Sequence, residues 1–144
     1  MILAEAVHLM DVNVLIARLF EDHEHHGAAR RWFDTPGLQW ALCPWTEAGF
    51  LRYATRPGRI SMGEATGILN SLRQQPGCHY HPVTRDWQTL TKPFFNRLHG
   101  HNQVTDACLL GMAIMDKLIL VTFDRAILHL AGEYRQHVLV LNAP

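Results

Sequence analysis

Residues 118–127 read LILVTFDRAI, an apolar run that leads directly into a carboxylate. The run from Leu118 to Phe123 is typical of a strand that is buried on both faces in a parallel sheet. Asp124 follows at the point where that strand must end. Asp is a common helix N-cap, so Asp124 taken alone has an ordinary structural explanation. A functional explanation requires other acidic residues placed to meet it.

The rest of the chain alternates short apolar runs with segments of helical spacing. The patterns predict strands at 6–10, 38–43, 118–123 and 137–142, with a short candidate at 78–83. They predict helices at 13–20, 28–34, 45–55, 61–75 and 105–116, and two helical pieces over 86–99, where Pro93 interrupts. This alternation indicates an α/β fold, with a central parallel β-sheet flanked by helices on both faces. The 144 residues fit a single domain over 1–144.

Composition excludes several broad classes of protein. The formal net charge is zero, so no overall basic field indicates a nucleic-acid partner, although a local basic groove stays open. The cysteines Cys43, Cys78 and Cys108 are far apart, which fits neither a disulfide framework nor a C-x-x-C site. The N-terminal stretch MILAEAVHLMDVNVL lacks the basic and long apolar regions of a signal peptide or a membrane span. We therefore expect a cytoplasmic protein.

Three further acids stand where Asp124 stands, at a strand end or in the first turn of a helix. Asp11 follows the first predicted strand, Glu47 lies in the first turn after the second, and Asp106 lies in the first turn of its own helix. Each acid alone is better explained by the helix macrodipole, which favours acids at N-termini. However, the carboxyl ends of parallel strands share one edge of the sheet, so we expect the four side chains in one crevice.

Four like charges in one crevice repel one another, and either protonation or a bound cation must offset that repulsion. A hard divalent cation such as Mg²⁺ takes oxygen ligands, and it uses only a few carboxylates because it keeps several waters. The chemistry expected of such a site is hydrolysis at phosphorus. The metal lowers the pKa of a bound water and neutralises charge on the phosphate.

Four segments that contain these acids look familiar when they are taken in order. MDVNVLIA (10–17), CPWTEAGFLR (43–52), GHNQVTDACLLGMA (100–113) and VTFDRAI (121–127) resemble PIN-domain ribonucleases, and most closely the VapC toxins of bacterial toxin–antitoxin pairs. The resemblance spans roughly residues 7–128, and each segment matches in the neighbours of the acid as well as in the acid itself.

The resemblance implies a fold, an activity and partners. The fold would be a single PIN domain. The activity would be endonucleolytic cleavage of RNA, dependent on Mg²⁺ or Mn²⁺, by the toxin of a type II toxin–antitoxin pair. The partners would be a VapB-type antitoxin that silences the toxin, and a second copy of the chain in a homodimer. Which RNA is cut stays open.

The resemblance also assigns residue roles. The four catalytic acids of the family match, in order, Asp11 of DVN, Glu47 of TEAGF, Asp106 of TDA and Asp124 of FDR. Asp11 and Asp106 are expected to ligate the metal directly. Glu47 and Asp124 would hold metal-bound waters or a second ion, or would orient the attacking water, and the sequence leaves that choice open.

Asn13 and Thr122 fall where the family often has polar supports. Asn13 could cap the helix after Asp11, hydrogen-bond a carboxylate, or do both. Thr122 could steady Asp124, although a β-branched residue is also ordinary in a strand.

Other classes of protein fit less well. A haloacid-dehalogenase phosphatase needs a second Asp two residues after the first, where this chain has Asn13, and a receiver domain needs a Lys after the last strand. Neither a P-loop nor a dinucleotide-binding glycine pattern occurs. The remaining alternative is a PIN-fold RNA- or protein-binding module without nuclease activity of its own.

Basic and aromatic residues on the helix after Glu47 are candidates for RNA contacts. Arg52, Arg56 and Arg59 could line a rim of the acidic crevice, since phosphates need counter-charges there. Tyr53 or Trp45 could stack on an unpaired base. A solvated helix face explains the arginines equally well.

Two other features have ordinary explanations. His23, His25 and His26 lack a Cys partner or a regular helical pair, so a solvated loop is favoured over a transition-metal site. The helix at 61–75 carries apolar residues that suit either an interface or a core, namely Met62, Ile68, Leu69 and Leu72.

Overall fold

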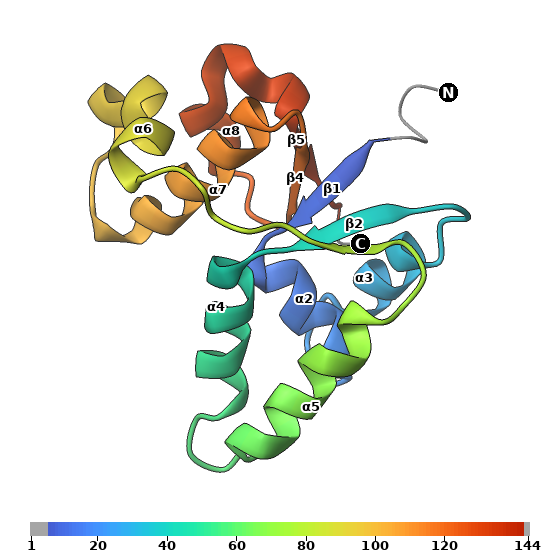
Figure 1. Cartoon of the computed structure of the whole chain (residues 1–144). Helices are drawn as coiled ribbons and strands as arrows, with labels where there is room; N and C mark the ends of the chain where they lie inside the picture. The colour runs from blue at the N-terminus through green and yellow to red at the C-terminus, as the bar shows by residue number, and fades with distance from the viewer. Residues whose placement is uncertain (1–5, 143–144) are drawn as a thin grey trace.

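The computed structural model describes residues 6–142, apart from the side chain of Asn102. Five parallel strands form one sheet in the order β3-β2-β1-β4-β5 (Figure 1). The strands are, in chain order, β1 Val7–Met10, β2 Gln39–Leu42, β3 Cys78–Tyr80, β4 Ile119–Thr122 and β5 Val138–Val140. Every predicted strand is present, and each is slightly shorter than predicted. β1 lies at the centre and pairs with both β2 and β4.

Helices cover both faces of this sheet, which confirms the predicted α/β architecture (Figure 1). One face carries α2 Val12–Leu19, α3 His26–Phe33, α4 Pro44–Ala54 and α5 Met62–Arg73. The other face carries α6 Trp87–Thr91, α7 Val104–Met115 and α8 Ile127–Ala131. Short 3₁₀ segments complete the chain, namely η1 Lys92–Arg97, η2 His101–Gln103 and η3 Gly132–His137.

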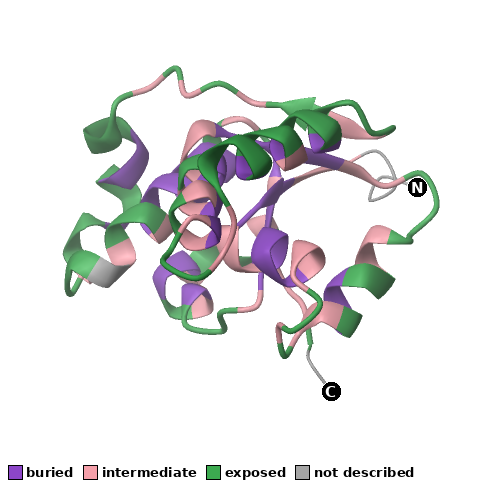
Figure 2. Cartoon of the chain, turned by 90° about the horizontal axis from the view of Figure 1, so that it is seen from below, coloured by how far each residue is buried: buried purple, intermediate pink, exposed green. Residues whose placement is uncertain are grey.

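Alternation along the strands divides the core between the two faces. Leu9 of β1 packs with Phe94 and the helices α6 to α8, whereas its neighbour Met10 packs with Phe50 and the helices α2, α4 and α5. All four side chains are completely buried. Figure 2 shows the buried residues along the sheet and on the helix faces that turn toward it. Both faces of the sheet are therefore dry, as a parallel sheet requires.

Local sequence signals set the helix boundaries. Ser61 and Glu64 form the predicted capping box at the start of α5, with both hydrogen bonds at 3.1 Å. Pro93 divides α6 from η1, as expected of a residue without a backbone N–H. A Cβ at Gly111 of α7 would lie only 2.0 Å from the carbonyl oxygen of Leu90. Glycine at this position therefore allows α7 to approach α6 closely.

The carboxyl ends of the five strands point to one edge of the sheet. β1 runs into α2 through Asp11, β2 runs into α4 through Cys43, and β4 ends two residues before Asp124. Among residues 6–142, none of the helices combines the length and apolar character that crossing a bilayer requires.

Candidate active site

Asp11 follows β1 directly and is only 8% exposed. Its Oδ1 accepts a hydrogen bond of 2.7 Å from the backbone N–H of Val12, at the start of α2. Its Oδ2 accepts a hydrogen bond of 2.6 Å from the hydroxyl of Thr122, at the end of the adjacent strand β4. Both oxygens of this buried carboxylate are therefore held in a fixed orientation.

Thr122 connects several parts of this edge. Besides donating to Asp11, its hydroxyl accepts hydrogen bonds from the Asn13 amide at 3.2 Å and from the backbone N–H of Asp124 at 3.0 Å. The Asn13 carbonyl oxygen in turn accepts from the backbone N–H of Phe123 at 3.2 Å. These hydrogen bonds join the start of α2 to the end of β4. Asn13 and Thr122 therefore lie where they could support Asp11 and Asp124.

Asp124 and Asp106 line one small cavity at this edge. The Oδ1 of Asp124 accepts a hydrogen bond of 2.9 Å from the backbone N–H of Ala126, which fixes the turn before α8. Asp106 lies in the first turn of α7. The cavity has a volume of about 180 Å³, and its lining consists of Gln103, Asp106, Asp124, Ala126, Ile127 and Leu130.

The three aspartates act on one another as like charges. Burial raises the pKa of Asp106 to about 7, and the charges of Asp11 and Asp124 contribute to that rise. Burial also raises the pKa of Asp11, and the charge of Asp124 adds to the rise. The hydrogen bonds from Thr122 and Val12 oppose the shift at Asp11 without cancelling it. The aspartates therefore form an acidic cluster that protonation or a cation would stabilise.

The charge of Glu47, the fourth predicted acid, is paired with an arginine. It lies in the first turn of α4, and Arg73 at the end of α5 binds it with two hydrogen bonds. The Arg73 Nε–H donates to Glu47 Oε2 at 2.8 Å, and Nη2–H donates to Oε1 at 2.6 Å. The guanidinium also lies 4.4 Å from the centroid of the Tyr80 ring. Neither Arg73 nor Tyr80 was among the residues singled out from the sequence, and the structure brings Arg73 to Glu47 and Tyr80 to Arg73.

No local pattern in the sequence indicates that Arg73 and Glu47 form a pair. A basic residue in the last turn of a helix has an ordinary explanation in the helix macrodipole. Arg73 lies 26 positions after Glu47, and only the packing of α5 against α4 brings the two side chains together.

The acidic cluster has the donor chemistry of a site for a hard cation. Among residues 6–142, no three His, Cys, Asp or Glu side chains are already arranged to hold a metal ion together. Mg²⁺ does not need such a set, because it retains several waters and uses one or two carboxylates. Asp11 and Asp106 could supply those ligands, and a cation would stabilise the charged carboxylates that burial and, to a smaller extent, mutual repulsion disfavour.

Two of the three arginines that could have lined a rim of the crevice, Arg56 and Arg59, lie elsewhere. Arg56 packs its guanidinium 3.9 Å from the centroid of the Tyr53 ring, and Arg59 contacts Asp22, Phe20 and Tyr53. Both follow the C-terminal end of α4, whereas Glu47 lies at its N-terminal end. A helix of 11 residues is about 16 Å long, so these arginines are distant from the acids.

The histidine-rich segment packs against the protein. The ring of His25 stacks on Phe123 with centroids 4.7 Å apart, and the Nδ1 of His26 lies 2.7 Å from the carbonyl oxygen of Ala17. The Nδ1 of His23 accepts a hydrogen bond from the backbone N–H of His25. These contacts give the three rings structural roles on α3 and the turn before it.

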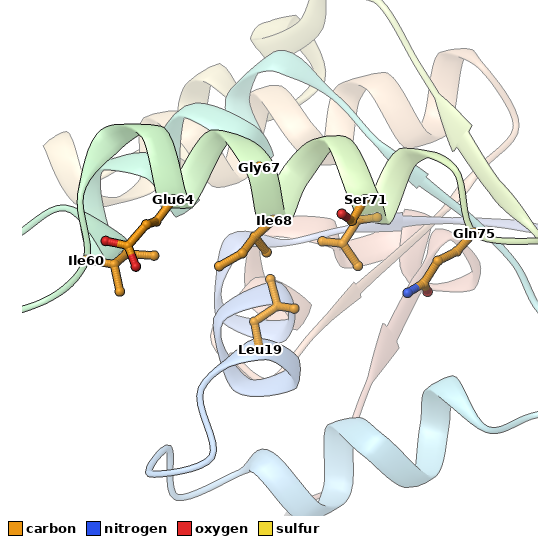
Figure 3. A pocket seen from close by; sticks show the side chains of 8 residues that line it. Leu19, Ile60, Glu64, Gly67, Ile68, Ser71 and Gln75 are labelled. Carbon is orange, nitrogen blue, oxygen red and sulfur yellow. The ribbon is translucent and has the colours of Figure 1, made fainter.

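An open apolar groove of about 570 Å³ follows α5. Figure 3 shows Ile68 of α5 facing Leu19, the last residue of α2, across it. Leu69 belongs to the buried core, and Met62 is 56% exposed. The groove is lined by Leu19, Ile60, Glu64, Gly67, Ile68, Ser71, Leu72 and Gln75. The predicted apolar residues of this helix are thus divided between core and surface.

Comparison with known sequences finds matches over most of this chain. The family model of the PIN domain matches residues 9–133. Ribonuclease VapC38 of Mycobacterium tuberculosis is 39% identical over 130 residues, which cover 87% of this chain and 90% of the relative. Ribonuclease VapC44 of the same species is 34% identical over 143 residues, which cover 92% of this chain and 98% of the relative.

Comparison with solved structures finds the same architecture. A toxin–antitoxin complex from Klebsiella pneumoniae contains a chain that superposes with a TM-score of 0.62. The match covers 92% of this chain and 96% of that chain, at 18% sequence identity. At that identity the likeness is one of fold.

Proposed function

The chain belongs to the PIN domain family, and from this premise we propose that it is a metal-dependent endoribonuclease that acts as the toxin of a toxin–antitoxin pair. Its sequence relatives are named ribonucleases, which supports the reaction class. The observation that carries the metal dependence is the cluster of Asp11, Asp106 and Asp124, whose charges no basic side chain is seen to balance among the described residues.

In the proposed site, Asp11 and Asp106 hold Mg²⁺, for which Mn²⁺ can substitute. The bound ion supplies Lewis-acid chemistry at phosphorus, because it neutralises phosphate charge and lowers the pKa of a water. The hydrogen bonds from Thr122 and Val12 orient Asp11 for this task and favour its ionised form. Asp124 faces the same cavity as Asp106 and orients the attacking water.

Glu47 is the fourth catalytic acid in this proposal. The bidentate bond from Arg73 occupies both of its oxygens, which favours a role at a distance from the ion over direct ligation. Asn13 and Thr122 act as polar supports, because their hydrogen bonds hold the start of α2 against the end of β4.

Incubation of the purified chain with RNA and Mg²⁺ tests this proposal. We expect cleavage that stops in EDTA and returns when Mg²⁺ or Mn²⁺ is added in excess. Cleavage that continues at the same rate in EDTA would exclude the metal mechanism. A chain that binds RNA or protein partners and never cleaves RNA would favour the alternative of a binding module.

We also propose a small VapB-type antitoxin as a partner, with the groove along α5 as its binding surface. Ile68 and Leu19 form an apolar floor, and Glu64 and Gln75 add polar groups, a combination that fits one face of an amphipathic helix. Ile68→Lys should abolish antitoxin binding and leave RNA cleavage unchanged. Antitoxin affinity equal to that of the parent would exclude this groove.

A homodimer completes the proposal. Trp87 and Phe95 are 55% and 65% exposed, and both line an apolar hollow of about 320 Å³ on α6 and η1. Large exposed aromatic residues that share one patch are typical of an interaction surface. Light scattering at micromolar concentration should give about twice the 16.4 kDa mass of one chain. A single species of one chain mass would contradict the dimer.

A further inference from the structure

We propose that Arg73 and Tyr80 form a binding site for the RNA strand beside the acids, in which Arg73 contacts a backbone phosphate and Tyr80 stacks on an unpaired base. This inference rests on the proposed ribonuclease function. In this proposal Arg73 takes the RNA-contacting role for which Arg56 and Arg59 were candidates, because those two arginines pack against aromatic rings at the distant end of α4.

The position of the pair on the sheet is the first argument. Tyr80 is the last residue of β3 and lies opposite Leu42, the last residue of β2. β3, β2 and β1 are successive strands, so Tyr80, at the end of β3, and Asp11, directly after β1, belong to strands about 10 Å apart, at two strand spacings. A strand of RNA that crosses this edge would meet an aromatic ring, then a cation, and then the aspartates.

The geometry of Arg73 is the second argument. Its Nε and one Nη2 hydrogen are used by Glu47, and among the described residues its Nη1 makes no hydrogen bond to the protein. The side chain is 43% exposed, whereas Glu47 is only 9% exposed. One edge of the fork is thus held by Glu47, and the other edge can donate to a phosphate. A guanidinium fixed in this way loses little conformational entropy when it binds.

The electrostatics of the edge supply the third argument. Asp11, Asp106 and Asp124 gather at one edge of the sheet and would repel a phosphodiester, so the strand needs a cation close to them. Arg73 is a cation that directly contacts one of the predicted catalytic acids. Tyr80 is 46% exposed and holds the guanidinium near its ring. An exposed ring beside a cation is the usual equipment for binding single-stranded nucleic acid without strict sequence preference.

RNA binding can be measured apart from cleavage in the Asp106→Asn chain with Mg²⁺ present, using a labelled single-stranded RNA that has no self-complementarity. Tyr80→Leu removes the ring and keeps apolar bulk, and we expect it to raise the Kd about tenfold. Arg73→Lys keeps the charge beside Glu47 and removes the planar fork, and we expect an increase of about fivefold. In the chain with Asp106 intact, Tyr80→Leu should raise KM and leave kcat within about twofold, because it leaves the bond between Arg73 and Glu47 in place.

Arg56→Lys is the matched control, because Arg56 also lies over a tyrosine ring but at the distant end of α4. Kd values for the Tyr80 and Arg73 variants that equal the control value would overturn the inference. A fall in kcat at unchanged KM would also overturn it, since the pair would then act only through Glu47. A change in oligomeric mass would overturn it by making the pair part of an interface between copies. If Arg73→Lys does not melt cooperatively, Tyr80→Leu decides alone.

Failure of this inference is distinguishable from failure of the proposed function. A parent chain that cleaves RNA with Mg²⁺ and whose RNA affinity does not depend on Arg73 or Tyr80 refutes only the binding site. A parent chain that does not cleave RNA under any metal condition refutes the proposed function itself.

Discussion

Glu47 and Asp106 lie at the same edge of the sheet, each in the first turn of a helix. Glu47 is paired with a basic side chain, whereas the charged neighbours of Asp106 are other acids. Arg73 donates two hydrogen bonds to Glu47, so that this acid is neutralised within the protein. Asp106 instead faces Asp124 across a small cavity, and burial together with Asp11 and Asp124 raises its pKa to about 7. The comparison separates an acid that is paired with an arginine from acids for which no basic partner is seen among the described residues.

The largest expected effect is on catalysis by the aspartates. Asp106→Asn should reduce RNA cleavage by about 10²-fold or more, because a ligand to the ion is lost. The same change removes a repelling charge with little change in shape, so the metal-free chain should be as stable as the parent or more stable. Cleavage rates, and melting temperatures with and without Mg²⁺, check both expectations. We expect Mg²⁺ to raise the melting temperature of the variant less than that of the parent.

A variant that melts far below the parent and also fails to bind the antitoxin would make Asp106 a structural residue. A variant that cleaves RNA at the parent rate would remove Asp106 from the site.

Thr122→Val tests whether the aspartate cluster depends on its hydrogen bonds. The hydroxyl donates to Asp11 and accepts from Asn13 and from the backbone of Asp124, and valine has nearly the same shape. Loss of the donor should raise the pKa of Asp11 further and weaken metal binding, so cleavage should fall about tenfold at low Mg²⁺. A titration of rate against Mg²⁺ should show recovery at high concentration. Equal Mg²⁺ dependence in variant and parent would show that the hydroxyl is dispensable.

Glu47→Gln should shift stability in the opposite direction from Asp106→Asn. The amide cannot accept two charge-assisted hydrogen bonds from Arg73, and we expect a loss of about 1–3 kcal/mol in the free energy of unfolding. Urea denaturation of the two variants side by side measures the contrast. If both variants gained stability, the hydrogen bonds from Arg73 to Glu47 would not stabilise the fold, and the contrast with Asp106 would fail.

The smallest effect concerns Asp116, an acid that is paired like Glu47 but lies away from the site. Burial alone would raise the pKa of Asp116, but hydrogen bonds from His81 and Arg85 outweigh it, so the pKa is lowered. A lowered pKa means that the pairing stabilises the fold above pH 4 and is lost as the pH falls through the folded-state pKa. Asp116→Asn should therefore cost about 1 kcal/mol at pH 7 and progressively less in acid. A cost that is independent of pH would contradict this assignment.

Much of the fold follows from local patterns in the sequence. The runs around Asp11 and Asp124 define two strands that end on acids, and parallel pairing brings these ends together. The capping box at Ser61 and the interruption at Pro93 are equally local, and both were predictable. Boundaries shifted by one to three residues, because strand ends are decided by pairing with neighbours.

The parts that could not be predicted depend on how helices are rotated and packed. Nothing near Arg73 in the sequence indicates that it meets Glu47. Arg56 and Arg59 lie in the same stretch of sequence as Glu47, yet the length of α4 separates them from it. The family resemblance placed Thr122 among the expected polar supports, but the sequence does not indicate its partners. Two of its three hydrogen bonds join it to Asp11 and Asn13, which are more than 100 positions away in the chain.

The bond between Asp11 and Thr122 joins residues that are 111 positions apart, and it has a consequence for the order of events during synthesis. The groove that we propose for the antitoxin is lined only by residues up to Gln75, whereas the acidic edge requires β4 and Asp124. Translation therefore produces every residue of the partner surface well before the residues that complete the acidic edge. Pairing between strands so distant in the chain is also a slow step in folding. A ribosome-bound chain that stops before β4 would contain every residue that lines the groove but would lack Asp124 of the acidic edge.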